Sequence, residues 1–192
     1  MNDSDKEVIA IKLEENFTCI RGLSKKRIRY EVEYGLERGS SVNSYLINPN
    51  DNSNTALLIH PPGENYAKQF MEVLDESCYK NINKLLIVIG HVNPNRVNLI
   101  KRIIKRYPES KLICSAPGSK LLIEVWTAEK PTKDNSESII VPNPLPEIIQ
   151  IKEDQTFNFN NEKILNFITA PTARWPGGLI VSFPLKNTVN GT

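Results

Sequence analysis

The sequence has few of the residues that disulfide frameworks and clustered metal sites require. It holds only two histidines and three cysteines in 192 residues. The cysteines, Cys19, Cys78 and Cys114, are far apart and include no C-x-x-C pair, which argues against a disulfide framework and against a zinc knuckle. We therefore expect a protein of a reducing cytoplasm whose thiols are buried as small hydrophobic side chains.

Long apolar segments and an excess of charge of one sign are lacking too. The longest purely apolar run, 85–89, has five residues, far fewer than the roughly 20 that span a bilayer. The acidic first residues have no apolar stretch behind them, unlike a signal peptide. The 24 basic residues nearly balance the 22 acidic ones, so charge gives no reason to expect nucleic acid or an anionic membrane as a partner.

Apolar residues make up 40% of the chain, which is enough for one packed domain of ordinary size over residues 1–192. The first 60 residues alternate like strands and predict an antiparallel meander, after which helical spacing alternates with short apolar runs. Strands are expected at 7–13, 27–34, 41–47, 55–59, 84–89, 111–115, 155–159, 163–169 and 178–183, helices at 64–79, 95–107 and 118–126, and a loop at 127–146.

This succession of elements predicts an α/β (α+β) fold in which sheets form a sandwich with helices outside. The end of the chain is unusual, because Asn190-Gly191 is a strong two-residue hairpin signal with no strand after it. We therefore expect the front part of a longer protein. An incomplete sandwich exposes a sheet edge, so the chain alone is expected to be marginally stable and to self-associate.

Two loops that follow predicted strands carry the polar residues from which a site could form. Loops at the carboxyl ends of buried strands are where α/β proteins commonly place functional groups. The first loop covers residues 90–96 and the second covers residues 170–178. Together they contain the candidate residues His91, Asn93, Asn95, Arg96 and Arg174.

The chain resembles the flavodiiron proteins, in particular the diflavin flavoproteins of phototrophs, over nearly its whole length. The resemblance rests on four segments, 39–47, 57–63, 90–96 and 169–177, of which the Arg-Trp-Pro stretch in the last is the most specific. It implies a metallo-β-lactamase-like αββα sandwich, incomplete at its C-terminal end and without the family's flavodoxin-like domain. At the family level it implies an oxidoreductase that passes electrons from NAD(P)H through FMN to oxygen at a di-iron centre.

The metal-binding motif that the resemblance implies, His-x-Glu-x-Asp-His followed by a later His before Trp-Pro, is degenerate here. The five positions read, in order, His91, Asn93, Asn95, Arg96 and Arg174, while His60 matches no ligand position. Two lost carboxylates and two gained guanidinium groups make the pocket about four charges more positive. A guanidinium group only donates hydrogen bonds and cannot ligate a metal.

We therefore expect no metal catalysis by this chain and no cofactor in it, neither di-iron nor FMN, and leave open whether it is an enzyme. Arg96 and Arg174 are anion-binding candidates, or pair with a carboxylate as a structural ion pair. His91 is either a ligand or a structural, hydrogen-bonded side chain. The expected partner is a second subunit, in a homodimer or in a heterodimer with a related flavodiiron protein. The alternatives are a non-catalytic anion-binding scaffold and a non-functional gene fragment.

Two further features have plain interpretations beside functional ones. The basic residues of the 95–107 helix form either a solvated face or a docking face for a partner; they are Lys101, Arg102, Lys105 and Arg106. Gly118-Ser-Lys120 lacks the upstream glycine of a phosphate-binding loop and is interpreted as a helix start.

Overall fold

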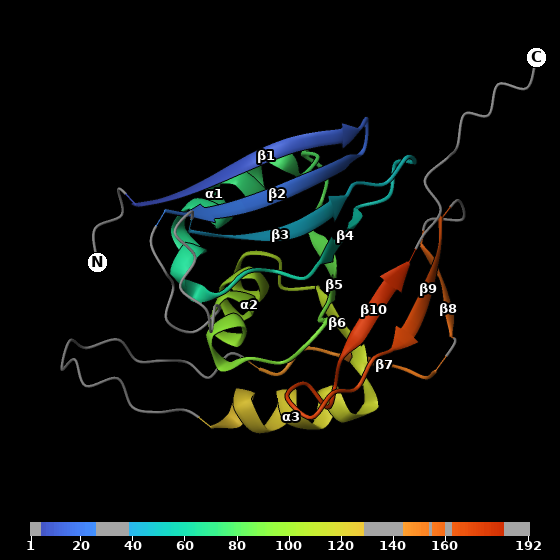
Figure 1. Ribbon diagram of the computed structural model, residues 1–192. Coiled ribbons are helices and arrows are strands. Elements are labelled where there is room, and N and C mark those ends of the chain that lie inside the picture. Colours follow the sequence, from blue (N-terminus) through green and yellow to red (C-terminus); the bar gives the residue numbers. More distant parts are fainter. Residues whose placement is uncertain (1–4, 26–38, 129–143, 154, 160–162, 183–192) are drawn as a thin grey trace, which may run out of the picture.

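The structure, a computed structural model, describes residues 5–25, 39–128, 144–153, 155–159 and 163–182 (Figure 1). Two sheets and three α-helices make up this part of the chain. The larger sheet has seven strands in sequence order: β1 (Lys6–Glu14), β2 (Phe17–Ser24), β3 (Ser40–Ile47), β4 (Thr55–Ile59), β5 (Lys84–Val88), β6 (Lys111–Ser115) and β7 (Ile148–Ile151). Neighbours from β1 to β4 are antiparallel, and those from β4 to β7 are parallel.

The smaller sheet is antiparallel and has the order β10-β9-β8. Its strands are β8 (Thr156–Phe159), β9 (Lys163–Thr169) and β10 (Leu179–Ser182). The helices are η2 (Glu64–Tyr66), α1 (Ala67–Ser77), α2 (Pro94–Arg106) and α3 (Ala116–Thr127). Among the described residues, no helix has the length and apolar content to span a membrane.

The seven-stranded sheet is buried on both faces, because alternate side chains of its central strands enter two different cores. Leu58, Leu85 and Ile87 belong to the core under the helices. Leu57 and Leu86, next to them in sequence, belong to the core under the three-stranded sheet. Helices, large sheet and small sheet therefore form three successive layers (Figure 1). These are three of the four layers of the predicted αββα sandwich, which confirms the predicted fold class.

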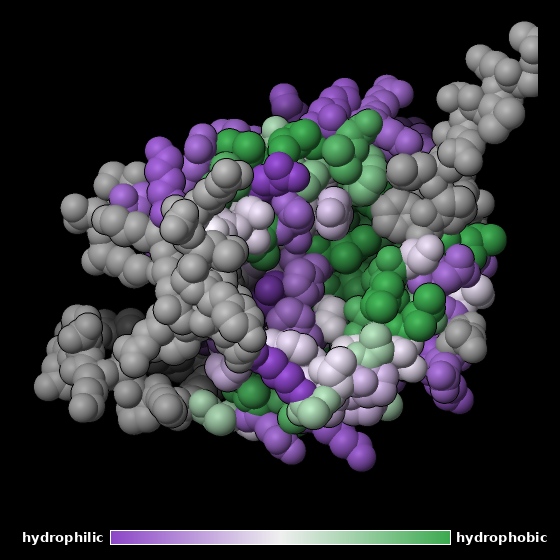
Figure 2. Space-filling view, in the orientation of Figure 1, coloured by the Kyte–Doolittle hydropathy of each residue, from purple (hydrophilic) through white to green (hydrophobic). Residues whose placement is uncertain are grey.

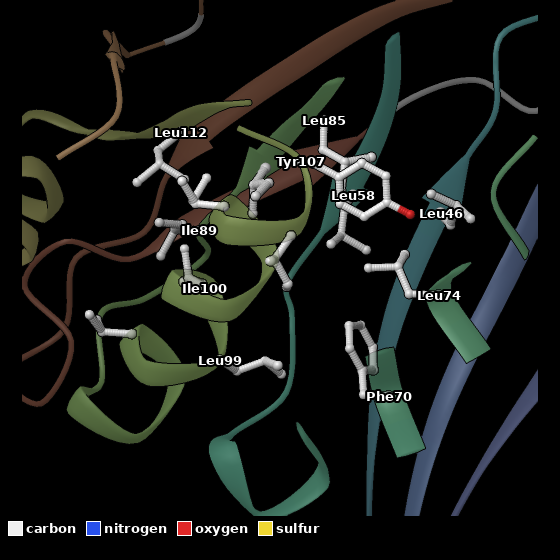
Figure 3. Packing of buried hydrophobic residues seen from close by; sticks show 14 of the residues in the cluster. Leu46, Leu58, Phe70, Leu74, Leu85, Ile89, Leu99, Ile100, Tyr107 and Leu112 are labelled. Atoms are coloured by element: carbon white, nitrogen blue, oxygen red, sulfur yellow. The ribbon is translucent and has the colours of Figure 1, made fainter. Parts of the chain in front are cut away.

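The helix-side core is closed by the apolar faces of α1 and α2. Phe70 and Leu74 of α1 and Leu99 and Ile100 of α2 are all at most 1% exposed, and they pack with sheet residues such as Leu58 (Figure 3). The four-residue step from Phe70 to Leu74 on α1 is the helical pattern visible in the sequence. On α2 the buried residues Val97, Ile100 and Ile104 follow at steps of three and four. The predicted apolar stripe of α2 is therefore confirmed.

Helix α2 begins at Pro94, one residue before the predicted range of 95–107. Asn93, not Asn95, is the N-cap, and its side-chain oxygen accepts a hydrogen bond of 2.9 Å from the backbone N–H of Asn95. Pro94 follows as the first helical residue, where its missing N–H costs nothing and its fixed φ favours the helix. The sequence offers Asn95 as a possible cap of this helix, and this prediction is wrong because Asn95 lies inside the helix.

The basic residues of α2 are largely engaged at the surface. Arg102 pairs with Glu64 at 2.6 Å, and Arg106 pairs with Asp75 at 3.1 Å. Lys101 donates a hydrogen bond of 3.0 Å to the backbone oxygen of Trp126. These contacts favour a solvated, ion-paired face over a docking face.

Two strands of the structure were not predicted from the sequence. Some of the predicted elements lie outside the described residues. Strands β2 and β7 were not predicted, because glycine and threonine interrupt the pattern of the first and the second has only four residues. The expected strand 27–34, most of the expected loop 127–146 and the turn at 190–191 are not described. Residues 118–120 lie inside α3, as a helix start requires.

Candidate functional site

The site lies where three loops meet at one edge of the large sheet. The first follows β4 and carries His60, and the second joins β5 to α2 and carries His91, with Arg96 in the first turn of α2. Because β4 and β5 are parallel neighbours, their carboxyl ends lie at the same edge of the sheet. The third loop joins β9 to β10 and brings Arg174 and Trp175 from the small sheet.

The aromatic rings of the three loops lie next to one another in tilted orientations. The ring centroids of His60 and His91 are 4.9 Å apart, and those of His91 and Trp175 are 4.2 Å apart. The guanidinium carbon of Arg174 lies 5.3 Å from the centre of the Trp175 ring. The structure thus brings His91 and Arg174 together, as the degenerate motif predicts, and adds His60, which the motif does not contain.

His60 is held in an uncommon backbone conformation. Its φ of +58° lies in the left-handed region, which a side chain other than glycine seldom adopts. Two hydrogen bonds fix this residue, from its own N–H to Val88 O at 2.9 Å and from the Ser44 hydroxyl to His60 O at 2.8 Å. Strained residues of this kind cluster at functional sites, so His60 belongs to the candidate site.

Arg96 is the buried cation of the site. The residue is only 9% exposed, and its guanidinium group donates a hydrogen bond of 2.5 Å to the backbone oxygen of Pro61. This bond ties the start of α2 to the loop after β4. This carbonyl satisfies one of the donors of the guanidinium group.

Burial and neighbouring cations lower the pKa of both histidines. Burial, then Arg96 and then His91 lower the pKa of His60 from 6.5 to about 3. Burial, Arg96 and Arg174 lower the pKa of His91 from 6.5 to about 4. Both imidazoles are therefore neutral at pH 7.

These pKa values predict that stability falls in mild acid. Between about pH 6.5 and pH 4 the unfolded chain protonates both imidazoles while the folded chain does not, so the unfolded state binds more protons. The free energy of unfolding should then decline as pH falls through this window, by at most about 1.4 kcal/mol per pH unit for each histidine. Urea denaturation at pH 7, 6 and 5 measures this slope. The double variant His60→Gln, His91→Gln is the control and should lose most of it, whereas an unchanged slope would contradict the assignment.

The loop that carries Arg174 is anchored to α3 by close backbone contact. The Ser115 hydroxyl, at the N-cap of α3, donates a hydrogen bond of 2.9 Å to Gly177 O and accepts one from Gly118 N. The backbone of Leu179 donates a hydrogen bond of 2.8 Å to Gly90 O, which joins the two sheets beside the site. The position of Arg174 therefore depends on a tight fit of Gly177 against Gly118.

Replacing Gly177 by alanine should loosen this anchor. A Cβ atom there would lie 2.5 Å from the Cα and 2.7 Å from the N of Gly118, and both are backbone atoms that cannot turn away. We expect Gly177→Ala to lower the free energy of unfolding by about 1–3 kcal/mol and to change the Trp175 fluorescence. The control is Ala173→Ser, at an exposed position of the same loop, which should stay within about 0.5 kcal/mol. Equal effects of the two variants would show that the fit is not tight.

Beside the site, the two sheets leave an apolar cavity of about 440 Å³. Its lining comes from β2, β3 and β4 on one side and β10 on the other, with His60 and Gly90 at its edge. On the face shown in Figure 2, hydrophilic residues gather in the centre and hydrophobic residues lie beside them toward the small sheet. The candidate site is thus polar and adjoins an apolar space.

Comparisons with known proteins place this fold among flavodiiron proteins. A diflavin flavoprotein from Nostoc sp. (A 4) is 32% identical over 91% of this chain, and one from Synechocystis sp. (A 4) is 33% identical over 80%. Among solved structures, a metal-soaked flavodiiron core from Synechocystis sp. matches 93% of this chain with 27% identity and a TM-score of 0.74. Fragment 1–254 of a Nostoc diflavin flavoprotein (A 5) matches 92% with a TM-score of 0.72. No protein-family model matches the chain.

The match covers only part of each relative. The chain spans 27% of the length of the Nostoc protein and 40% of the metal-soaked core. It covers 62% of the 254-residue fragment. The motifs predicted a resemblance to the N-terminal, metallo-β-lactamase-like part of these proteins. The comparisons confirm this resemblance.

The comparisons correct one prediction. From the altered ligand positions, the chain was expected to need no cofactor at all. The solved relatives that match over nine tenths of this chain are, however, named as flavodiiron proteins, and one of them is a metal-soaked core. The prediction that this chain needs no cofactor is therefore wrong. Proteins that contain a part matching this chain are named as flavodiiron proteins.

The donor set in this chain nevertheless differs from a di-iron motif. Of the five motif positions only His91 keeps a metal-binding side chain, and Arg96 fills another with a buried cation. Within the described ranges, no three histidine, cysteine, aspartate or glutamate side chains lie close enough together to hold one ion. The described residues by themselves therefore do not fit a di-iron centre.

Proposed function

Because the chain is a relative of the flavodiiron proteins with the metallo-β-lactamase-like fold of their N-terminal part, we propose that it is the corresponding domain of an oxygen-reducing diflavin electron-transfer protein. In this proposal the di-iron site is degenerate and the chain performs no metal catalysis of its own. Its contribution is structural, as the folded partner of a catalytically competent subunit. We place the protein in the cytoplasm, where its three free cysteines stay reduced.

The observation that carries the proposal is the burial of Arg96 at a ligand position of the motif. A guanidinium group stays protonated and offers no lone pair to a metal. Its charge would also repel a second cation at about 4 Å by about 4 kcal/mol at an effective dielectric of about 20. The hydrogen bond to Pro61 O holds this group in the loop cluster, so the charge belongs to the folded site.

Pairing with a second subunit is supported by exposed apolar residues on the small sheet. Ile164, Ile168 and Ile180 are 47–52% exposed, and Ile168 and Ile180 are register partners on β9 and β10. Side chains of this kind on one sheet face are typical of interaction surfaces. We propose a homodimer or a heterodimer with a related flavodiiron subunit.

A second candidate function is a scaffold that uses the arginine-lined pocket for an anion. It is favoured by the finding that, beside burial, Arg96 lowers the pKa of both His60 and His91 and Arg174 lowers the pKa of His91. This candidate is compatible with the first, because a domain without metal catalysis can still hold a ligand.

Oxygen consumption tests the proposed function. The purified chain is incubated with ferrous iron, freed of excess metal, and supplied with chemically reduced FMN under an oxygen electrode. The expected rate equals that of reduced FMN alone, in the presence or absence of the chain. A matched control is the variant His91→Ala, which should behave identically. A rate well above background in the wild type that is lost in His91→Ala would overturn the proposal, because the site would then catalyse metal-dependent oxygen reduction.

A further inference from the structure

The apolar cavity of about 440 Å³ between the two sheets has the size and lining of a small-molecule site. Phe17 of β2, Tyr45 of β3 and Ile59 of β4 line it from the large sheet. Leu179 and Val181 of β10 line it from the small sheet. Figure 2 shows hydrophobic residues gathered toward the small sheet, beside the hydrophilic centre of this face.

The backbone around the cavity is fixed by hydrogen bonds. His60 N donates to Val88 O at 2.9 Å, and Leu179 N donates to Gly90 O at 2.8 Å. Gly90 also lies close to the His60 ring, because a Cβ atom at position 90 would be 2.9 Å from His60 Nδ1. These contacts join the large sheet to the small sheet beside the cavity. A ligand therefore meets a preformed space, and binding costs little ordering of the protein.

The lining combines aromatic and aliphatic side chains with few polar groups. The ring centroids of Phe17 and Tyr45 are 5.8 Å apart, and the two rings are tilted by 37°. Tyr45 and Ile59 pack against the core on this side of the sheet but are only partly buried. His60 and Ser182 add polar groups, and the lining contains no aspartate, glutamate, lysine or arginine.

We propose that this cavity binds a small, neutral molecule that carries an aromatic ring and one hydrogen-bonding group. The aromatic rings of the wall favour a ring in the ligand, through offset or edge-to-face packing. The imidazole of His60 or the hydroxyl of Ser182 can bind the polar group. A charged ligand is disfavoured, because no charged side chain of the lining replaces the water around it. The site goes beyond the proposed function, since none of the lining residues stands at a position of the metal motif.

Fluorescence titration of the intact chain with N-phenylnaphthylamine, a neutral aromatic amine whose emission rises in apolar surroundings, tests this inference. We expect saturable binding of about one probe per chain. The sulfonated analogue, anilinonaphthalene sulfonate, carries a negative charge and should bind at least about tenfold more weakly. Equal or tighter binding of the sulfonated analogue would overturn the assignment of a neutral ligand, and a signal that does not saturate would overturn the site itself.

Two substitutions on one strand locate the bound probe. Val181→Phe enlarges a side chain of the lining and should weaken binding at least about tenfold, because it fills part of the cavity. Ile180→Phe is the matched control, since Ile180 is 52% exposed, does not line the cavity and lies on the other face of the same strand. The control should keep the affinity of the wild type within about twofold. Equal affinities of the two variants would show that the probe binds elsewhere.

A second measurement needs no substitution, which covers the case in which Val181→Phe folds poorly. Nuclear Overhauser contacts from the aromatic protons of the probe should reach the methyl groups of Ile59 and Val181 in the wild type. Contacts only with the exposed Ile164 and Ile168 of β9 would place the probe on the outer face of the small sheet and contradict the inference. Loss of probe binding in parallel with dimer formation would also contradict it, because a second copy of the chain would then occupy the cavity.

Discussion

Restoring the family's motif should convert this pocket into a zinc site. The variant combines Asn93→Glu, Asn95→Asp, Arg96→His and Arg174→His, which returns two carboxylates and two imidazoles to the loop cluster around His91. We expect it to bind zinc at least about a thousandfold more tightly than the wild type. Removing one repulsive charge at about 4 Å is alone worth about 4 kcal/mol at an effective dielectric near 20, or about three powers of ten in affinity.

The readout for this variant is competition with a zinc-binding dye at neutral pH. A control with a charge change outside the pocket combines Asn98→Asp and Arg102→His on the same helix. This control should bind zinc no better than the wild type. If the restored variant also showed no gain, then the loops would not bring the motif positions together, and the geometry of the site would be wrong.

Truncating Phe70 should produce the largest loss of stability. Phe70 is fully buried on α1 and packs in the core between the helices and the large sheet (Figure 3). Phe70→Ala removes most of a large apolar side chain and leaves a cavity, which typically costs about 3–5 kcal/mol. That loss is a large part of the total stability of a single domain.

Urea denaturation followed by circular dichroism measures this loss. The matched control is Ile123→Ala on α3, where the side chain is 41% exposed and the new residue favours the helix. The control should lose less than about 1 kcal/mol. Similar losses in both variants would mean that α1 does not pack against the sheet as described.

Much of the fold follows from local pattern. The five-residue apolar run at β5 predicts a strand that is buried on both faces. The helical spacing of the apolar residues in α2 predicts an amphipathic helix. Strand β2 was missed because its faces differ little in the sequence: Thr18, Arg21 and Gly22 interrupt the apolar residues. Its place is set by pairing with β1 and β3, which is long-range information that no local window contains.

The candidate site could be predicted only in part. The motif comparison identified His91, Arg96 and Arg174, and the structure brings these three residues to one loop cluster. His60 was set aside because it matches no ligand position, yet its ring lies 4.9 Å from that of His91. The signal was present, since both histidines follow parallel strands that end at the same edge. The role of Ser115 as the anchor for Gly177 spans 62 residues and leaves no trace in the local sequence.

The charge of the pocket separates this chain from what its fold alone would suggest. A metallo-β-lactamase-like fold places loops where a metal can bind, but the residues on those loops decide which ion is favoured. Here a buried guanidinium, a second guanidinium and two neutral imidazoles share the cluster. The central proposal is therefore that this loop cluster does not hold a di-iron centre.

A crystal structure of the chain grown in sulfate and soaked with ferrous iron, with data collected at the iron absorption edge, tests this claim most directly. We predict no anomalous signal beside His91, with Arg96 keeping its hydrogen bond to the backbone oxygen of Pro61. An anomalous peak bonded to His91, with the two arginines turned away, would contradict the claim.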